Sequence, residues 1–458
     1  MKKTVSDSPI ALQRCDFDSD FAWGCATSAY QIEGATGEDG RVESIWDRFN
    51  TQPGNIRDGS GGEIACDHYH RWREDLDIAR ELGLNAYRFS IAWPRIFSGK
   101  GCRPNPKGLA FYSQLVDGML ERGLQPWATL YHWDLPQYLQ DSGGWQKRDT
   151  VASFVEFAHA MSQHLGDRVK NWITHNEPWC ASIHGNFEGV HAPGIKDFKT
   201  ALQVCHHILL SHGQAIPVVK ANVPEAKVGI ALSLHPLSAA SDRAEDIAAT
   251  ARHDGLRNRW FLDPLYGRGY PADIQEWCHA DLPNIKVGDL EVIATPTDFL
   301  GVNYYFPEII AHAPGAAPVD SRVVVSEKVE RTAFGWEVSP QGLTILLKRI
   351  EEDYQPGDMY ITENGSTYED VVADDGEIYD AERRHYLIRH LGATKNAIAQ
   401  GIKIKGYFVW SLLDNFEWAE GYTRRFGLAH VDFVTQRRQL KQSGKWYRTF
   451  LQQSDKLP

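Results

Sequence analysis

The sequence predicts an α/β protein built as a single closed (β/α)8 barrel. Short runs rich in β-branched and aromatic residues recur eight times, and amphipathic segments with helical periodicity separate them. No change in composition marks an internal boundary within the 458 residues. Strict alternation of strand and helix implies a parallel sheet, and eight repeats imply its closure. We expect an N-terminal extension over residues 1–14 and the barrel over residues 15–454.

The individual elements follow from local patterns of apolar residues. The expected strands are residues 21–25, 86–91, 126–131, 171–175, 228–234, 299–304, 359–362 and 406–412. The clearest helices, with apolar residues at helical spacing, are expected at 69–82, 108–121, 151–165, 200–220, 341–353 and 381–399. The longer connections 35–65, 185–197, 260–297 and 306–335 hold the Gly and Pro clusters. We expect these four connections to be loops over the mouth of the barrel.

Composition and charge exclude several classes of partner. The 48 basic and 60 acidic residues give a net charge of −12 without any Lys/Arg-rich block, so a nucleic acid is not expected to bind. No apolar run approaches the roughly 18 to 20 residues of a membrane helix, so the chain is not expected to span a membrane. Lys2 and Lys3 are not followed by the apolar stretch of a signal peptide, which predicts a cytoplasmic protein.

The sequence predicts neither a metal nor another cofactor. The seven Cys residues form no C-x-x-C pair, which argues against a disulfide framework and a Cys-type zinc site. The segment Asp67-His68-Tyr69-His70 could be part of a metallohydrolase site. It leads into an amphipathic helix, however, so we expect Asp67 to be the N-cap of that helix. The Gly-rich segments 37–40 and 59–62 match no nucleotide-binding motif.

The aromatic content suggests a ligand with flat apolar faces. The chain has 15 Trp, 18 Tyr and 19 Phe residues. Aromatic rings pack well against sugar rings, whose C–H faces are apolar and whose rims carry hydroxyl groups. The alternative is that these rings only fill a large core.

Two glutamates follow expected strands at the end of a barrel where active sites form. The fourth strand is followed by Thr174-His175-Asn176-Glu177-Pro178 and the seventh by Glu363-Asn364-Gly365. Two facing carboxylates push their pKa values apart, which supplies one proton donor and one nucleophile. Retaining glycoside hydrolysis needs such a pair. Two structural salt bridges are the alternative interpretation.

The chain resembles glycoside hydrolase family 1, the β-glucosidase family, over residues 21–450. The motifs that carry this resemblance are FAWG (21–24), ATSAYQIEG (26–34), SIWD (44–47), YRFS (87–90), YHWDLP (131–136), NEP (176–178), NYY (303–305), TENG (362–365) and WSLLDNFEW (410–418). A lone NEP would mean little. All of these motifs in order, at the ends of predicted strands, make the match specific.

The resemblance implies a (β/α)8 barrel with a retaining, double-displacement mechanism. Glu177 would be the acid/base and Glu363 the nucleophile, supported by Arg88, Asn176, Asn303 and Tyr305. The glucosyl unit would be bound by Gln31, His132, Trp133, Trp410, Glu417, Trp418 and Phe426. Trp179, His184 and Trp336 would form the aglycone site. Glu417 is expected as an ionised acceptor for O4 and O6, which disfavours a 6-phosphate.

The expected substrates are small β-D-glucosides, with β-fucosides and β-galactosides as secondary substrates. A sugar-binding protein without catalysis and a transglycosylase are the alternatives, and the sequence leaves open whether the chain is a monomer or a small homo-oligomer. His175, which precedes Asn176, is expected to pack in the interior rather than to tune Glu177. Cys25 is expected only to pack. The sequon at Asn364 lies beside Glu363, where a glycan could not fit.

Overall fold

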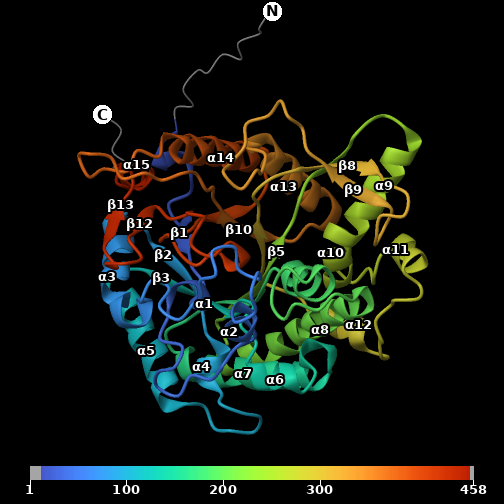
Figure 1. Ribbon diagram of the computed structural model, residues 1–458, viewed down its shortest axis with the longest axis horizontal. Coiled ribbons are helices and arrows are strands. Elements are labelled where there is room, and N and C mark those ends of the chain that lie inside the picture. The colour runs from blue at the N-terminus through green and yellow to red at the C-terminus, as the bar shows by residue number, and fades with distance from the viewer. Residues whose placement is uncertain (1–11, 454–458) are drawn as a thin grey trace, which may run out of the picture.

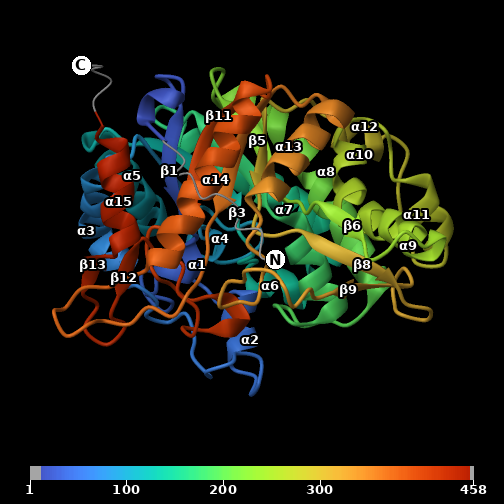
Figure 2. The ribbon, with the colours of Figure 1, turned by 90° about the horizontal axis from the view of Figure 1, so that it is seen from above.

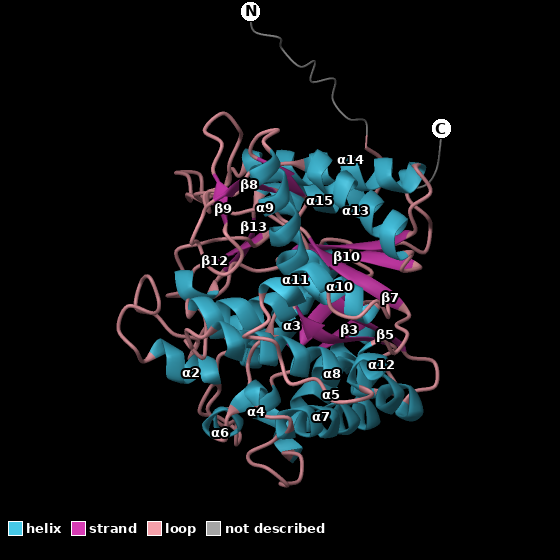
Figure 3. Ribbon diagram, turned by 90° about the vertical axis from the view of Figure 1, so that its right-hand side faces the viewer, coloured by secondary structure: helices cyan, strands magenta, loops and turns pink. Residues whose placement is uncertain are grey.

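The computed structural model describes residues 12–453. Eight parallel strands form a closed barrel in the order β1-β11-β10-β7-β5-β4-β3-β2, and helices surround it (Figure 3). The predicted (β/α)8 barrel is therefore confirmed. The expected N-terminal extension, residues 1–14, lies outside the described residues except for its last three.

The barrel strands match the eight predicted runs. They are β1 (Ala22–Ala26), β2 (Ala86–Ser90), β3 (Gln125–Tyr131), β4 (Asn171–Asn176), β5 (Lys227–Ser233), β7 (Phe299–Asn303), β10 (Asp358–Asn364) and β11 (Ile404–Trp410). Trp127, Phe299, Tyr360 and Phe408 pack against one another inside the barrel. Trp127, Phe299 and Tyr360 come from the amino-terminal halves of their strands, so aromatic rings fill that end of the barrel.

The six predicted helices are confirmed. They are α3 (His68–Glu81), α5 (Pro106–Glu121), α7 (Asp149–Leu165), α8 (Phe198–Asn222), α13 (Pro340–Tyr354) and α14 (Ala381–Ala399), and they lie outside the strands (Figure 1). Helix α5 begins at Pro106 because Asn105 accepts a hydrogen bond from the Lys107 N–H (3.2 Å).

The expected N-cap position of Asp67 is confirmed, but its side chain does not make a capping hydrogen bond. Asp67 stands at the N-cap position of α3, but its φ is 51° and its side chain accepts no capping hydrogen bond from the backbone. Its carboxylate instead binds His70 Nδ1 (2.6 Å) and Arg71 Nε (3.2 Å). The left-handed backbone turns this side chain away from the first free N–H groups of the helix.

The four connections expected as loops contain regular structure. Residues 35–65 include α2 (Ile45–Asn50), and residues 185–197 begin inside the π-helix η3 (Cys180–Glu188). Residues 260–297 include three short helices, namely α10 (Trp260–Leu265), α11 (Ala272–Trp277) and α12 (Asp289–Ile293). These elements span five to nine residues each, too few for periodicity to identify them against the neighbouring Gly and Pro residues.

Residues 306–335 contribute to a small second sheet. Strand β8 (Glu308–His312) pairs in parallel with β6 (Leu237–Ala239) and antiparallel with β9 (Ser321–Val324). This sheet lies beside α9 (Ala244–Asp254), apart from the barrel strands (Figure 2). The π-helix η4 (Gly255–Arg259) follows α9 directly.

The remaining elements are short, apart from the C-terminal helix. They are η1 (Arg14–Asp16), α1 (Ala29–Ile32), α4 (Trp93–Ile96), α6 (Gln137–Asp141), η2 (Gly144–Gln146), η5 (Trp418–Glu420), β12 (Ala429–Val431), β13 (Arg438–Leu440) and α15 (Gln442–Leu451). Within residues 12–453, no helix has both the length and the apolar character needed to cross a membrane.

Candidate active site

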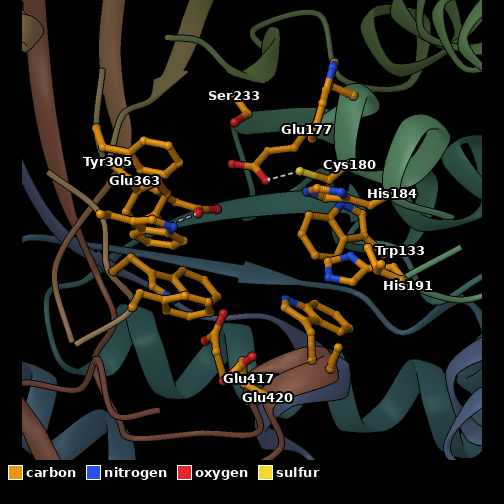
Figure 4. A pocket seen from close by; sticks show the side chains of 18 of the residues that line it. Trp133, Glu177, Cys180, His184, His191, Ser233, Tyr305, Glu363, Glu417 and Glu420 are labelled. Atoms are coloured by element: carbon orange, nitrogen blue, oxygen red, sulfur yellow. Dashed lines mark hydrogen bonds between the residues drawn. The ribbon is translucent and has the colours of Figure 1, made fainter. Parts of the chain in front are cut away.

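A pocket of about 410 Å³ opens at the carboxyl ends of the barrel strands (Figure 4). This volume lies within the range of small-molecule sites. Residues that end or follow β3, β4, β5, β7, β10 and β11 all contribute to its wall. The filled amino-terminal end of the barrel leaves this end as the place where side chains of separate strands meet around a ligand-sized space.

Glu177 and Glu363 lie in this pocket, as predicted. Glu177 directly follows β4 and is 6% exposed, while Glu363 lies near the end of β10 and is 4% exposed. Their carboxylates point into the same space (Figure 4). Burying two carboxylates together is costly unless donors surround them.

Glu363 is held by a cation and a hydroxyl group. Arg88 Nη1 donates to Glu363 Oε1 (2.6 Å), and the Tyr305 hydroxyl donates to Oε2 (2.7 Å). Burial raises the pKa of the Glu363 carboxyl to about 7 against the opposing effect of Arg88, and the nearby Glu177 carboxylate also raises it. Arg88 is itself buried and is fixed by Asn176 Oδ1 (2.6 Å).

Glu177 is held by neutral donors. Asn303 Nδ2 donates to its Oε1 (2.8 Å), and the Cys180 thiol donates to its Oε2 (3.1 Å). No cationic side chain of residues 12–453 forms an ion pair with Glu177, whereas Arg88 forms one with Glu363. The Arg88 cation therefore favours the charged form of Glu363, and Glu177 has no such cation beside it.

Asn176 connects the two glutamates. Its Oδ1 accepts from Arg88 Nη2 (2.6 Å) and from Asn303 Nδ2 (3.0 Å), and its Nδ2 donates to His132 Nε2 (3.0 Å). Because an amide has two N–H donors, one is left for a ligand. Burial lowers the pKa of His132 well below its usual value, so the ring is neutral and its Nδ1 carries the hydrogen.

Glu417 lies at the other end of the pocket from Glu177 (Figure 4). Burial raises the pKa of its carboxyl to about 8, with a further contribution from Glu363. Burial thus disfavours the charged form of Glu417 that the sequence led us to expect, and the ionised Glu417 stays a prediction. Gln31 Nε2 lies 3.5 Å from Glu417 Oε2 and donates to the Phe416 carbonyl oxygen (2.9 Å), behind the residues that line the pocket.

Aromatic rings form much of the remaining wall. Trp133, Trp410, Trp418 and Phe426 line the pocket, and the Trp133 indole donates to the Asn176 carbonyl oxygen (2.8 Å). Trp133, Glu177 and Trp418 have positive φ angles of 78°, 46° and 51°. Non-glycine residues in this region cost about 1–3 kcal/mol each, and such strain is concentrated at functional sites.

The residues expected at the aglycone side also line the pocket. Trp179 and His184 make an edge-to-face contact with ring centroids 4.5 Å apart. Trp336 lies between the rings of Phe306 (4.8 Å) and Phe334 (4.3 Å). The structure thus brings together, in or directly behind one pocket, all the residues predicted for the site.

Sequence reasoning missed several residues of the wall. Among them are Cys180, His191, Ser233, His235, Arg257, Phe306, Glu308, Phe334 and Glu420. Ser233 is the last residue of β5, and His235 follows this strand by two residues. Inspecting the end of every predicted strand would have found both. Arg257 lies on η4, and nothing in its local sequence indicates that it reaches the pocket.

The other singled-out residues have structural surroundings. His175 is buried, stacks on Phe154 (4.3 Å) and bonds the Ser211 hydroxyl (2.8 Å), which supports interior packing. Cys25 lies in the core. The Asn364 amide is buried and donates to the Tyr304 carbonyl oxygen (2.6 Å), so a glycan there would disrupt the site.

The histidines of the 67–70 segment pair with carboxylates rather than converging on one point. His68 pairs with Asp75 (2.7 Å), and His70 with Asp67 (2.6 Å) and Glu38 (3.2 Å). In the part of the chain that the structure describes, no three His, Cys, Asp or Glu side chains group as metal ligands.

Comparison with known proteins identifies the family. A sequence profile described as glycosyl hydrolase family 1 matches residues 13–456. β-Glucosidase A of Acetivibrio thermocellus is 46% identical over 95% of this chain and 98% of its own. A bifunctional β-D-glucosidase/β-D-fucosidase of Bifidobacterium breve is 41% identical over 95% of this chain and 98% of its own.

The solved structure of a Thermotoga maritima β-glucosidase in complex with deoxynojirimycin is similar in fold. It superposes with a TM-score of 0.93 at 44% identity, over 95% of this chain and 98% of that one. These matches span nearly the whole chain in sequence and in fold. The chain belongs to glycosyl hydrolase family 1.

Proposed function

We propose that the protein is a retaining β-glucosidase that hydrolyses terminal, non-reducing β-D-glucosyl residues. Its substrates are cello-oligosaccharides and aryl or alkyl β-glucosides. The observation that carries the proposal is the unequal support of two buried carboxyls, since Arg88 contacts Glu363 and neutral donors contact Glu177. Family membership supports the same chemistry.

In this mechanism Glu363 attacks the anomeric carbon while Glu177 protonates the leaving oxygen. The C1–O bond to the aglycone breaks, and an ester forms between C1 and Glu363. Glu177 then removes a proton from water, which attacks C1 and releases glucose with Glu363 as the leaving carboxylate. Retention of configuration follows from the two displacements at the same carbon.

Arg88 and Tyr305 keep Glu363 oriented for attack. The free N–H of Asn176 binds the 2-hydroxyl of the sugar, a contact that strengthens in the transition state. Asn303 positions Glu177 through its 2.8 Å hydrogen bond. Hydrogen bonds within the protein hold all these groups in place, so little reorganisation is left for the reaction step.

The glucosyl unit binds between His132, Trp410, Trp418 and Glu417. The His132 Nδ1–H is buried and has no acceptor within residues 12–453, so it is available to a sugar hydroxyl. Glu417 accepts from O4 and O6 when ionised, with Gln31 beside it and Phe426 near the 6-position. Trp179, His184 and Trp336 contact the aglycone.

Secondary activities on β-D-fucosides and β-D-galactosides fit this arrangement. The Bifidobacterium relative is named as a bifunctional glucosidase/fucosidase. A 6-deoxy sugar loses one hydrogen-bond partner of Glu417, and an axial O4 still reaches Glu417 or Gln31. Transglycosylation to an alcohol or sugar uses the same residues.

A cytoplasmic role in the breakdown of cellulose fragments completes the proposal. The Cys180 thiol lies beside the acid/base in the pocket, where oxidation would disturb Glu177, so a reducing compartment suits the site. Separation of cytoplasm from other cell fractions, followed by assay of β-glucosidase activity, tests the location.

The mechanism is tested by trapping the covalent intermediate. A 2-deoxy-2-fluoro-β-glucoside with a good leaving group is expected to add one glycosyl mass to the peptide that contains Glu363. Peptide mass spectrometry locates the label, and NMR of the first product reports its anomeric configuration. A label on another residue, or an inverted first product, would contradict the proposal.

A further inference from the structure

Arg257 is a buried cation in the wall of the pocket. It lies on the π-helix η4, is 5% exposed and lines the pocket with Glu177. Its Nη2 donates to the Ser233 hydroxyl oxygen (3.0 Å) and to His235 Nε2 (2.5 Å), and Ser233 lies beside Glu177 in Figure 4. The guanidinium therefore lies on the side where the leaving group departs.

Most of the hydrogen-bonding capacity of this guanidinium is unused. Arg257 Nε and Nη1 are buried and have no hydrogen-bond partner among residues 12–453. Together they carry three of the five N–H donors of an arginine. In the same range, no carboxylate forms an ion pair with Arg257. Buried N–H donors without acceptors are costly, which suggests that a ligand supplies the missing acceptors.

The neighbouring charged groups are engaged with other partners. The Glu308 carboxylate of this wall contacts His235 (3.3 Å) and His253 (3.3 Å), and the charge of Arg257 helps to lower its pKa, which burial acts to raise. Glu188 binds His184, and Glu420 lies with Arg57 (3.0 Å) and Arg424 (3.2 Å). Arg257 acts on the Glu308 and Glu188 carboxylates only through its charge, and no carboxylate of residues 12–453 contacts its Nε or Nη1.

Aromatic rings fix the guanidinium and offer a surface beside it. Arg257 Cζ lies 3.7 Å from the centroid of the Trp179 ring, a cation–π contact that leaves the N–H edges free. Phe306 packs against His235, with centroids 4.5 Å apart, and against Trp336. An aromatic ring on the leaving group would find apolar surface next to a cation.

We propose that the aglycone side of the pocket selects aryl β-glucosides whose ring carries a carboxylate, and that Arg257 binds this carboxylate. The hydrogen bonds run from Nη1 and Nε to the carboxylate oxygens, in the charge-assisted form that arginine makes most strongly. The inference rests on the proposed β-glucosidase activity and names a substrate class for it. Arg257 takes no part in bond breaking.

The test compares a charged substrate with its neutral analogue. The value of kcat/KM is measured for 4-carboxyphenyl and 4-carbamoylphenyl β-D-glucoside with the wild type and with Arg257→Leu. The ratio of the two values is expected to fall about tenfold or more in Arg257→Leu, the range of a hydrogen bond between charged groups. Comparing ratios cancels the difference in leaving-group ability.

A matched control and a second readout complete the design. Arg252 also stacks on a tryptophan, Trp277 at 4.5 Å, but does not line the pocket, so Arg252→Leu is expected to leave the ratio unchanged. Inhibition constants of 4-hydroxybenzoate and 4-hydroxybenzamide against 4-nitrophenyl β-glucoside report the same preference without turnover of either probe. Arg257→Gln serves if the leucine variant does not fold.

The outcomes separate the two proposals. An unchanged ratio in an Arg257 variant that still cleaves the neutral glucoside would overturn the carboxylate site, as would an equal loss on both substrates. If the wild type cleaves neither glucoside nor 4-nitrophenyl β-glucoside, it is the proposed β-glucosidase activity that fails.

Discussion

Each oxygen of Glu177 accepts a hydrogen bond from an uncharged donor, whereas Glu363 contacts a cation. This asymmetry decides which of the two glutamates can deliver a proton. If Glu177 is the acid, Glu177→Gln is expected to lower kcat strongly for alkyl glucosides and much less for activated aryl glucosides. General acid assistance is worth about 10² to 10⁴ in rate, and only poor leaving groups need it.

Steady-state kinetics on methyl and 2,4-dinitrophenyl β-glucoside measure the difference. Added azide is expected to restore turnover of the activated substrate and to give the β-glucosyl azide, because the amide no longer repels the anion. Equal losses on both substrates without rescue would remove Glu177 from the acid/base role.

Cys180 offers a test at the level of a single hydrogen bond. Burial raises the pKa of its thiol well above the usual value, so it remains a donor to Glu177. Losing a donor to the charged form makes Glu177 retain its proton to higher pH. A bond worth about 0.5–1 kcal/mol corresponds to a shift of roughly 0.4–0.7 pH units.

We therefore expect Cys180→Ala to move the alkaline limb of kcat/KM upward, while Cys180→Ser, which keeps a donor, does not. The pH profiles of both variants with 4-nitrophenyl β-glucoside check this. The same limb position in both variants would show that the thiol only fills space.

At the residue scale, the site residues that could be predicted from the sequence are polar or aromatic residues at the ends of strands. Glu177, Glu363 and Trp410 occupy such positions on β4, β10 and β11, so position and side chain indicate the site together. Arg257 and Glu308 could not be found in this way, because η4 and β8 are additional elements that do not belong to the repeating strand–helix units of the barrel. The charge state of Glu417 depends on burial and on Glu363, neither of which is local in sequence.

At the scale of elements, a buried ionic network fixes the segment that follows β11. Lys441 is fully buried and binds Asp370 (2.5 Å) and Asp414 (2.6 Å), while Arg425 also binds Asp414 (2.7 Å). Although burial acts to raise it, Lys441 and Arg383 keep the pKa of Asp370 below its usual value. This network ties the loop that carries Glu417 to α14 and α15.

Lys441→Met is expected to destabilise the fold by about 3–5 kcal/mol, because it leaves two buried carboxylates with less compensation. Urea denaturation at pH 7 measures the loss. Lys405→Met is the control, since its pair with Asp18 is partly exposed (3.1 Å) and such pairs contribute about 0.2–1 kcal/mol. Equal effects of the two substitutions would show that burial of the network is unimportant for stability.

The predicted elements share one property: a pattern of apolar residues, periodic in the helices and nearly continuous in the strands, extends over most of their length. Strands β3 and β5 are continuous apolar runs that bury both faces, as barrel strands must. Strand β8 begins with Glu308 and ends with His312, and it is only partly buried, so its sequence resembles a loop. It forms a strand because β6 and β9 pair with it, which only the folded chain can determine.

At the scale of the whole molecule, buried histidines make stability depend on pH. His132, His175, His212, His235 and His390 are at most 3% exposed. Burial lowers the pKa of His212 and His390 to about 3 and that of His235 to about 4, and lowers those of His132 and His175 well below the usual value. In the unfolded chain, each imidazole titrates near 6.5.

At acidic pH the unfolded chain binds more protons than the folded protein, so acid favours unfolding. Between about pH 4 and 6.5 the unfolded chain takes up protons that the folded protein refuses, so stability is complete above pH 6.5 and is lost as the pH falls. Each neutral imidazole then costs about 1.4 kcal/mol per pH unit below 6.5, or about 2 kcal/mol at pH 5. The summed loss from several such histidines is comparable with the free energy of unfolding of a typical domain, roughly 5–15 kcal/mol.

We expect the free energy of unfolding in urea to fall steeply between pH 7 and pH 5. His390 contacts Tyr386, with ring centroids 3.8 Å apart, so His390→Phe removes one titrating group while keeping an aromatic ring. This variant should lose about 2 kcal/mol less than the wild type over the same interval. His279→Gln, at an exposed position, should follow the wild type. An unaltered pH dependence in His390→Phe would mean that the imidazole is protonated in the folded protein, and that acid instability comes from the carboxylates instead.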